Sequence, residues 1–232
     1  MDVNLRSVST VLLPGTGSDD DYVYRAFSDP LHAVGAVVMA QPPQPGRLIE
    51  GYLEAMDKAA RHGPIAVGGV SIGAAVATGW ALAHPGRAVA VLAALPAWTG
   101  SPDSAPAALA ARLSADELRR DGLVAATTRM RASSPAWLAD ELSRSWAGQW
   151  PELPDAMEQA ATYVAPTCTE LESLTAPLGV AVASDDPLHP LQVGVEWVTA
   201  APRAALRMVT LAQIGADPGV LGAACLAALW DA

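Results

Sequence analysis

The chain has 232 residues and a formal net charge of −10 at pH 7, with 51% hydrophobic and 16% charged residues. This composition excludes intrinsic disorder, because disordered chains are poor in apolar residues and rich in charge. The acidic balance argues against a nucleic-acid partner and against binding to an anionic membrane, since both need clustered Lys and Arg.

Short apolar runs alternate with helical patterns in the first hundred residues. Apolar runs bounded by turn residues predict strands over 8–13, 34–40, 65–70 and 88–95. Helical spacing of apolar residues predicts helices over 22–31, 48–60 and 72–83. Strands that alternate with helices form βαβ units, so we expect a parallel sheet covered on both faces.

The pattern changes after residue 99. Helices are predicted over 105–113, 114–126, 135–146 and 154–163, and strands resume at 178–183 and 205–211. We therefore expect a core made of residues 1–99 and 168–232, with residues 100–167 as a helical cap insert. The insert leaves and re-enters at the carboxyl edge of the strands, where α/β sheets hold their sites.

The sharpest motif is Gly69-Val70-Ser71-Ile72-Gly73, which has the form G-x-S-x-G between a predicted strand and a predicted helix. A nucleophile on such a tight turn needs glycine on both sides, because side chains there would collide with neighbouring backbone. The motif predicts a nucleophile elbow with Ser71 at its apex. A Gly-Ser turn that only joins strand to helix is the structural alternative.

Leu13-Pro14-Gly15-Thr16-Gly17-Ser18 follows the first predicted strand. With this loop and the elbow, the sequence resembles the α/β-hydrolase fold family over nearly its whole length. The family usually has His-Gly here, and Pro14 in the His place is similar to type II thioesterases and some bacterial esterases. The resemblance implies an open, mostly parallel sheet of about six strands, flanked by helices, with an α-helical cap. It also implies an oxyanion hole formed by the backbone N–H groups of Thr16 and Ile72.

Ser184-Asp185-Asp186-Pro187-Leu188-His189 follows the strand at 178–183 and resembles the family's acid loop. The resemblance assigns Asp186 to orient the catalytic base, with Asp185 as the second candidate. A solvated turn that caps the next helix is the alternative interpretation.

The family's catalytic His normally follows the last strand, but Ala216 stands in its place. Asp217-Pro218 is expected to begin the last helix. His189 is the possible alternative base, although a His three residues after the orienting Asp is expected to brace the loop rather than to reach Ser71. Three explanations stay open: an engineered replacement, a natural protein without the base, or a base supplied by His189 or by the substrate.

The leading hypothesis is a serine hydrolase that cleaves carboxylic esters or thioesters of a small apolar substrate, with Ser71 as nucleophile and Trp98 near the pocket. The alternative is a ligand-binding pseudoenzyme of the same fold.

We expect no metal or other cofactor, because the acidic run Asp19-Asp20-Asp21 is better explained as a helix cap. The excess of 48 Ala and 13 Arg over one Lys indicates a bacterial source. The absence of an apolar signal segment predicts a cytoplasmic location.

Overall fold

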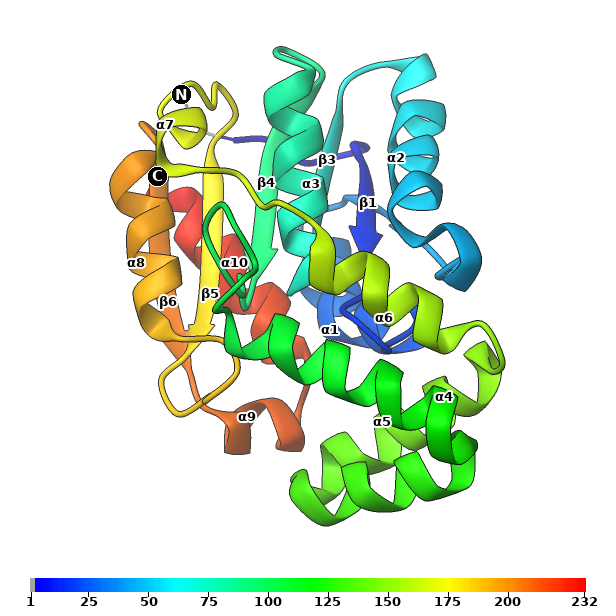
Figure 1. The fold of residues 1–232 in the computed structure, drawn as a ribbon. Coiled ribbons are helices and arrows are strands. Elements are labelled where there is room, and N and C mark those ends of the chain that lie inside the picture. Colours follow the sequence, from blue (N-terminus) through cyan, green and yellow to red (C-terminus); the bar gives the residue numbers. More distant parts are fainter. Residues whose placement is uncertain (1–2) are drawn as a thin grey trace.

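The computed structural model describes residues 3–232 and contains one sheet of six parallel strands (Figure 1). Their spatial order is β2-β1-β3-β4-β5-β6. The strands are β1 (Ser9–Leu13), β2 (Val37–Ala40), β3 (Ile65–Val70), β4 (Ala88–Ala94), β5 (Leu178–Ala183) and β6 (Ala204–Val209). This confirms the open parallel sheet that the alternating pattern predicted.

Helices cover both faces of the sheet. The apolar cluster on one face includes residues of α2 (Leu48–Ala59), α3 (Ile72–Ala83) and α8 (Leu191–Ala200). The cluster on the other face is built with α1 (Asp20–Ala33) and α10 (Gly219–Trp230). Both faces are therefore buried, which explains why the central strands are apolar at nearly every position.

Alternation along β1 shows how the sequence divides between the two faces. Val11 and Leu13 belong to the cluster under α2 and α3, whereas Leu12 belongs to the cluster under α1 and α10. All three side chains are fully buried. Burial of such a side chain stabilises the fold by about 1.5–3 kcal/mol, so the register of this strand is strongly specified.

Short helical turns complete the chain. They are η1 (Pro45–Arg47), η2 (Ala60–His62), α7 (Cys168–Leu171) and α9 (Leu211–Ala216). The last of these replaces the end of a predicted strand, because β6 stops at Val209 and Thr210 caps the helix that begins at Leu211.

Three long helices, α4–α6, lie between β4 and the short α7, and we refer to them as the helical insert. They are α4 (Pro106–Ser133), α5 (Ala136–Gln149) and α6 (Leu153–Thr162). The two helices expected over 105–113 and 114–126 do not divide there. The chain runs on as α4 and breaks at Gly122, whose φ of 78° and ψ of 172° are not helical. Glycine adopts this conformation without the cost of a Cβ, so the break falls at the one glycine of the segment.

In Figure 1 the insert lies across the end of the sheet to which the strand arrows point. The loops after β1, β3 and β5 therefore emerge beneath it. None of the helices in residues 3–232 has the length and apolar character needed to cross a membrane.

Candidate active site

Ser71 sits at the sharp turn between β3 and α3. Its backbone has a φ of 56° and a ψ of −115°, a conformation that costs a non-glycine residue about 1–3 kcal/mol. A Cβ atom added at Gly69 or at Gly73 would stand 2.2 Å from the carbonyl oxygen of Leu13. Both glycines of the motif are thus required by the close approach of β1, and the turn has the geometry expected of a nucleophile elbow.

His189 lies between Ser71 and Asp186. Its Nε2 atom is 2.9 Å from Ser71 Oγ, and its Nδ1 atom is 2.7 Å from Asp186 Oδ2. The expectation that a His three residues after the acid would not reach the serine is wrong. The Ser71, His189 and Asp186 side chains form a continuous hydrogen-bonded chain, so the imidazole that seemed to be missing beside Ser71 is present.

The backbone of the acid loop explains how His189, only three residues after Asp186, contacts both Asp186 and Ser71. Asp186 Oδ1 accepts hydrogen bonds from the backbone N–H groups of Leu188, at 2.8 Å, and His189, at 3.3 Å. These bonds fold the chain into a tight turn that is neither strand nor helix. The turn brings the His189 ring back over the carboxylate, and α8 begins only at Leu191.

Burial and hydrogen bonding act in opposite directions on Asp186, whose side chain is 8% exposed. Burial raises the pKa of this carboxyl, but the hydrogen bonds from the His189 ring and from the backbone N–H groups of Leu188 and His189 outweigh it and lower the pKa below its usual value. The ionised carboxylate accepts the Nδ1–H proton of His189. This leaves Nε2 as the acceptor for the Ser71 hydroxyl.

Asp185 and Ala216 both lie away from this chain of contacts. Asp185 Oδ1 accepts the backbone N–H of Leu211 at 2.8 Å, so this carboxylate supports the start of α9. Ala216 is the exposed last residue of α9, in a segment that was expected to be a loop. Helix formation there follows from the capping box made by Thr210 and Gln213, which the sequence prediction overlooked.

The last helix also begins later than predicted. Asp217 is the C-cap of α9, and α10 starts at Gly219. The Asp217 carboxylate still has a capping role, because its Oδ1 accepts the Gly219 N–H at 2.8 Å.

The loop after β1 packs directly on the elbow. A Cβ atom at Gly15 would stand 3.6 Å from Ser71 Cβ. The backbone N–H groups of Thr16 and Ile72 donate to no other group in residues 3–232. Ile72 is the first residue of α3, whose helix dipole favours negative charge at this end. Two free donors and a helix N-terminus can therefore receive an anionic oxygen next to Ser71.

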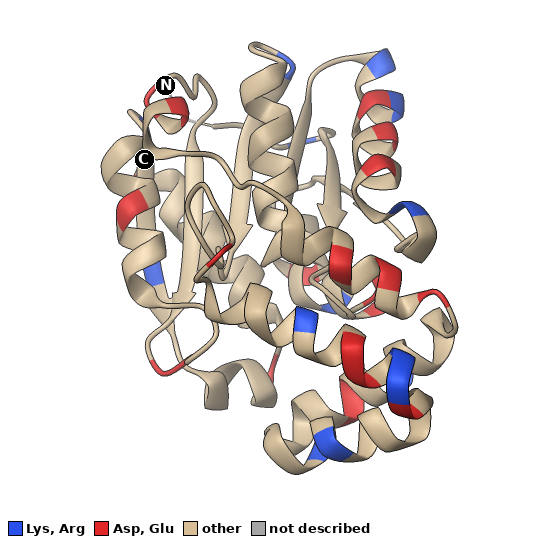
Figure 2. Ribbon diagram, viewed as in Figure 1, with Lys and Arg blue, Asp and Glu red and all other residues tan. Residues whose placement is uncertain are grey.

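The helical insert binds the same loop from the other side. Gln149 Nε2 donates to the carbonyl of Ser18 at 2.9 Å, and Arg144 pairs with Asp19 at 2.5 Å. Asp19 also caps α1 by accepting the N–H of Tyr22. The acidic run thus caps a helix and pairs with arginine, and residues 3–232 contain no cluster of three His, Cys, Asp or Glu side chains able to hold a metal ion. Figure 2 shows that charged residues gather on α2 and on the insert.

Trp98 follows β4 and is 6% exposed. Its indole N–H donates to the carbonyl of Tyr163 at 3.2 Å, which ties the segment before the insert to the segment after it. It packs within the core cluster that includes α3 and the insert.

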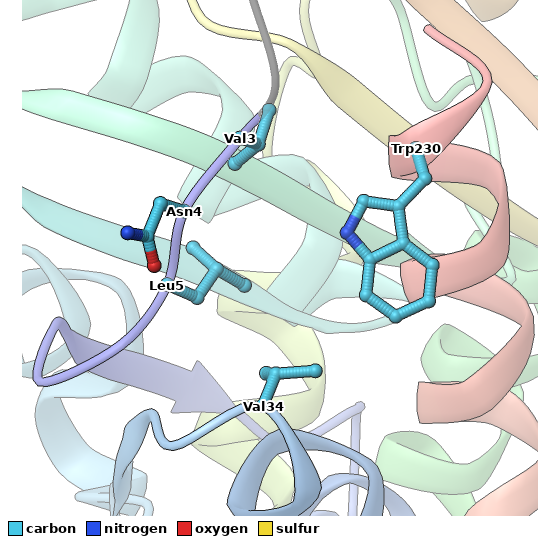
Figure 3. A pocket seen from close by; sticks show the side chains of 5 residues that line it. All are labelled: Val3, Asn4, Leu5, Val34 and Trp230. Atoms are coloured by element: carbon cyan, nitrogen blue, oxygen red, sulfur yellow. The ribbon is translucent and has the colours of Figure 1, made fainter.

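A hollow of about 210 Å³ lies at the opposite edge of the sheet, lined by Val3, Asn4, Leu5, Val34 and Trp230 (Figure 3). It contains no ionisable or nucleophilic side chain, so it is not a candidate for catalysis.

Solved structures with the same fold are numerous. A hydrolase from Oleispira antarctica has a TM-score of 0.67 at 14% identity, over 88% of this chain and 83% of that one. A thermophilic esterase from Thermogutta terrifontis has a TM-score of 0.64 at 17% identity, over 89% and 81%. NosK from Streptomyces actuosus has a TM-score of 0.64 at 17% identity, over 97% and 98%. At these identities the likeness shows the fold alone.

The sequence comparisons identify the family. No curated protein matches the chain significantly. The model of the thioesterase domain family matches residues 11–207, a span that includes Ser71, Asp186 and His189. The chain therefore belongs to the thioesterase domain family and is a hydrolase of the α/β-hydrolase fold that acts on esters.

Proposed function

We propose that the protein is a serine hydrolase that cleaves an ester or thioester of a small, apolar substrate through an acyl-enzyme on Ser71. One observation carries the proposal: His189 lies within hydrogen-bond distance of both Ser71 Oγ and Asp186 Oδ2. A serine hydroxyl is a weak nucleophile at pH 7 unless a base takes its proton. His189 is in position to do so.

In the first half of the reaction, Ser71 Oγ attacks the substrate carbonyl carbon while its proton passes to His189 Nε2. The ionised Asp186 stabilises the imidazolium that results. When the tetrahedral intermediate collapses, the bond to the leaving group breaks, and the Nε2 proton passes to the departing alcohol or thiol. In the second half, water attacks the acyl-enzyme by the same route and releases the acid and the free serine.

Negative charge develops on the carbonyl oxygen during both attacks. The N–H groups of Thr16 and Ile72 stabilise this oxyanion, and a donor of this kind contributes about 3–4 kcal/mol to transition-state binding. Close packing of Gly15 on the elbow holds the two donors near each other before substrate arrives. The site is therefore preorganised to stabilise negative charge on a carbonyl oxygen next to Ser71.

The hypothesis of a ligand-binding pseudoenzyme depended on Ala216. The contact between His189 and Ser71 favours catalysis instead, because the base comes from the acid loop. Residues 100–167 would then act as the cap over the site, with Trp98, which follows β4, near the pocket. A cytoplasmic location and a bacterial source remain predictions from the sequence.

The test is turnover of p-nitrophenyl butyrate by four chains: the wild type, Ser71→Ala, His189→Ala and His62→Ala. We expect the first two variants to lose about 10³-fold or more in kcat, as removal of a triad member does elsewhere. His62 is exposed at the end of η2 and serves as the matched control, with unchanged turnover. Wild-type activity that survives His189→Ala would contradict the assignment of the base.

A further inference from the structure

The indole N–H of Trp146 is buried without an acceptor. Trp146 lies on α5 and is 3% exposed, and its Nε1 atom has no hydrogen-bond partner among residues 3–232. A donor left unpaired in this way costs about 1–3 kcal/mol. Indole is only a donor, so this group is satisfied only when an acceptor lies in front of its N–H.

Other buried indoles of the chain have partners. Trp80 donates to Asp57 at 2.8 Å, Trp98 to the carbonyl of Tyr163 at 3.2 Å, and Trp197 to Thr99 at 3.2 Å. The fold thus satisfies its internal tryptophans, and Trp146 is the exception. An exception of this kind needs a reason, such as an acceptor that arrives from outside the chain.

The unpaired N–H lies at the loop that carries the oxyanion donors. A Cβ atom added at Gly17 would stand 2.6 Å from Trp146 Nε1 and 3.3 Å from the Met157 methyl group. Gly17 directly follows Thr16. On the same helix, Arg144 pairs with Asp19 and Gln149 binds the Ser18 carbonyl, so the indole is held against this loop from both sides.

The order of the strands indicates which part of a substrate would meet the indole. Gly17 lies in the loop after β1, on one side of β3, whereas His189 lies in the loop after β5, on the other side. His189 returns its proton to the leaving group, so the leaving group lies on the β5 side of Ser71. The acyl chain then extends towards β1, where Met157 provides an apolar contact and Trp146 provides the donor.

We propose that the Trp146 indole N–H binds an oxygen acceptor on the acyl chain of the substrate, so that the enzyme prefers acyl groups with a keto or ether oxygen over all-carbon chains. The inference rests on the proposed function and specifies its substrate class. The hydrogen bond forms where the acyl chain meets α5 and the loop after β1. The acyl chain is apolar next to this oxygen, because the Met157 methyl group lies beside Gly17.

The experiment compares three p-nitrophenyl esters: butyrate, methoxyacetate and 4-oxopentanoate. Methoxyacetate replaces one methylene of butyrate by an ether oxygen, and 4-oxopentanoate places a keto oxygen further along the chain. For Trp146→Phe, we expect kcat/KM for at least one oxygen-bearing ester to fall about tenfold more than kcat/KM for butyrate, the loss that one neutral hydrogen bond explains. Equal losses on all three esters would overturn the inference.

Trp197→Phe is the matched control, since it makes the same change at a buried indole whose N–H already has an acceptor. We expect it to change all three rates by one common factor. We also expect it to lower the melting temperature more than Trp146→Phe, because it removes a hydrogen bond that exists in the folded protein.

Ser71→Ala separates the two proposals. If wild type and Ser71→Ala are equally inactive on every ester, the proposed function is wrong and this inference with it. If wild type is active but shows no tryptophan-dependent preference, only the inference falls.

Discussion

At the scale of single residues, the hydrogen bonds that Asp186 accepts serve two purposes. They hold the His189 ring in the orientation that reaches Ser71, and they lower the pKa of the Asp186 carboxyl despite its burial. A group whose pKa is lowered on folding contributes stability above its unfolded pKa. That stability is lost as pH falls through the folded pKa.

Replacement of Asp186 by Asn is therefore expected to have a pH-dependent effect on stability. At pH 7 the Asp186→Asn protein should unfold at a lower urea concentration than the wild type. The difference should shrink as pH falls below about 3.9, where the wild-type carboxyl also becomes neutral in the unfolded chain, and vanish below the folded pKa. Urea titrations at a series of pH values between 7 and 2 measure it. A difference that stays constant over this range would show that the charge is not responsible.

The same variant should fail in catalysis while it keeps its shape. Asn presents an N–H to His189 Nδ1 and favours the tautomer with the proton on Nε2, which cannot accept from Ser71. A loss of kcat of about 10⁴-fold is the expected result, as in other triads.

The catalytic residues differ in how well the sequence predicts them. Ser71 follows from the glycines around it, because the backbone of β1 leaves no room for a side chain at either. The role of His189 was underestimated because it depends on a turn closed by three hydrogen bonds to Asp186, and side-chain direction in such a turn does not follow from strand or helix periodicity. The spacing Asp-x-x-His on a loop at the carboxyl edge was the available signal.

At the scale of elements, the elbow depends on the contact between β1 and the start of α3. Gly73→Ala would place a methyl group 2.2 Å from the Leu13 carbonyl oxygen and 2.8 Å from that of Pro14. Backbone atoms cannot yield as a flexible side chain would, so we expect a loss of about 1–3 kcal/mol in unfolding free energy together with most of the esterase activity. Thermal unfolding and p-nitrophenyl butyrate turnover measure the two effects.

Gly148→Ala is the matched control for this prediction. Gly148 lies within α5, and a Cβ atom there would meet nothing within 4 Å. Alanine is favoured over glycine in a helix by about 0.5–1 kcal/mol, so this variant should be as stable as the wild type or more so. If both variants lost stability equally, a steric explanation for Gly73 would be untenable.

Strands and helices of the core were predictable because burial on both sides leaves a clear apolar pattern, as in β3 and β5. Local side-chain caps and a glycine account for the differences between the predicted and the observed ends of the elements. The Thr210 and Gln213 side chains cap α9 and so end β6 two residues early, and Gly122 breaks α4 at a point that apolar spacing does not mark. Such effects depend on side-chain partners rather than on periodicity.

At the scale of the whole molecule, the helical insert and the sheet meet at the loop after β1. Arg144 of α5 pairs with Asp19, whose side chain is 15% exposed, and Arg25 of α1 pairs with Glu141 of α5 at 2.7 Å. These contacts join segments that are more than a hundred residues apart in the chain. The position of the insert therefore affects the loop that carries Thr16.

We expect Arg144→Met to loosen this loop with little effect on global stability. The Met side chain keeps most of the apolar stem but removes the ion pairs with Asp19, Asp21 and Glu141. A partly exposed pair contributes only about 0.2–1 kcal/mol to folding. Local opening is governed by few contacts, so the same loss should speed hydrogen exchange at the backbone amides of residues 15–19 by about twofold to fivefold. The measurement is exchange followed by mass spectrometry at low ionic strength, where charge pairing is least screened.

Arg119→Met is the control. Arg119 pairs with Asp155 and Glu158 inside the insert, and none of its ion pairs reaches the loop or the core helices. Faster exchange in both variants, or in neither, would mean that the Arg144 pair does not hold the loop in place.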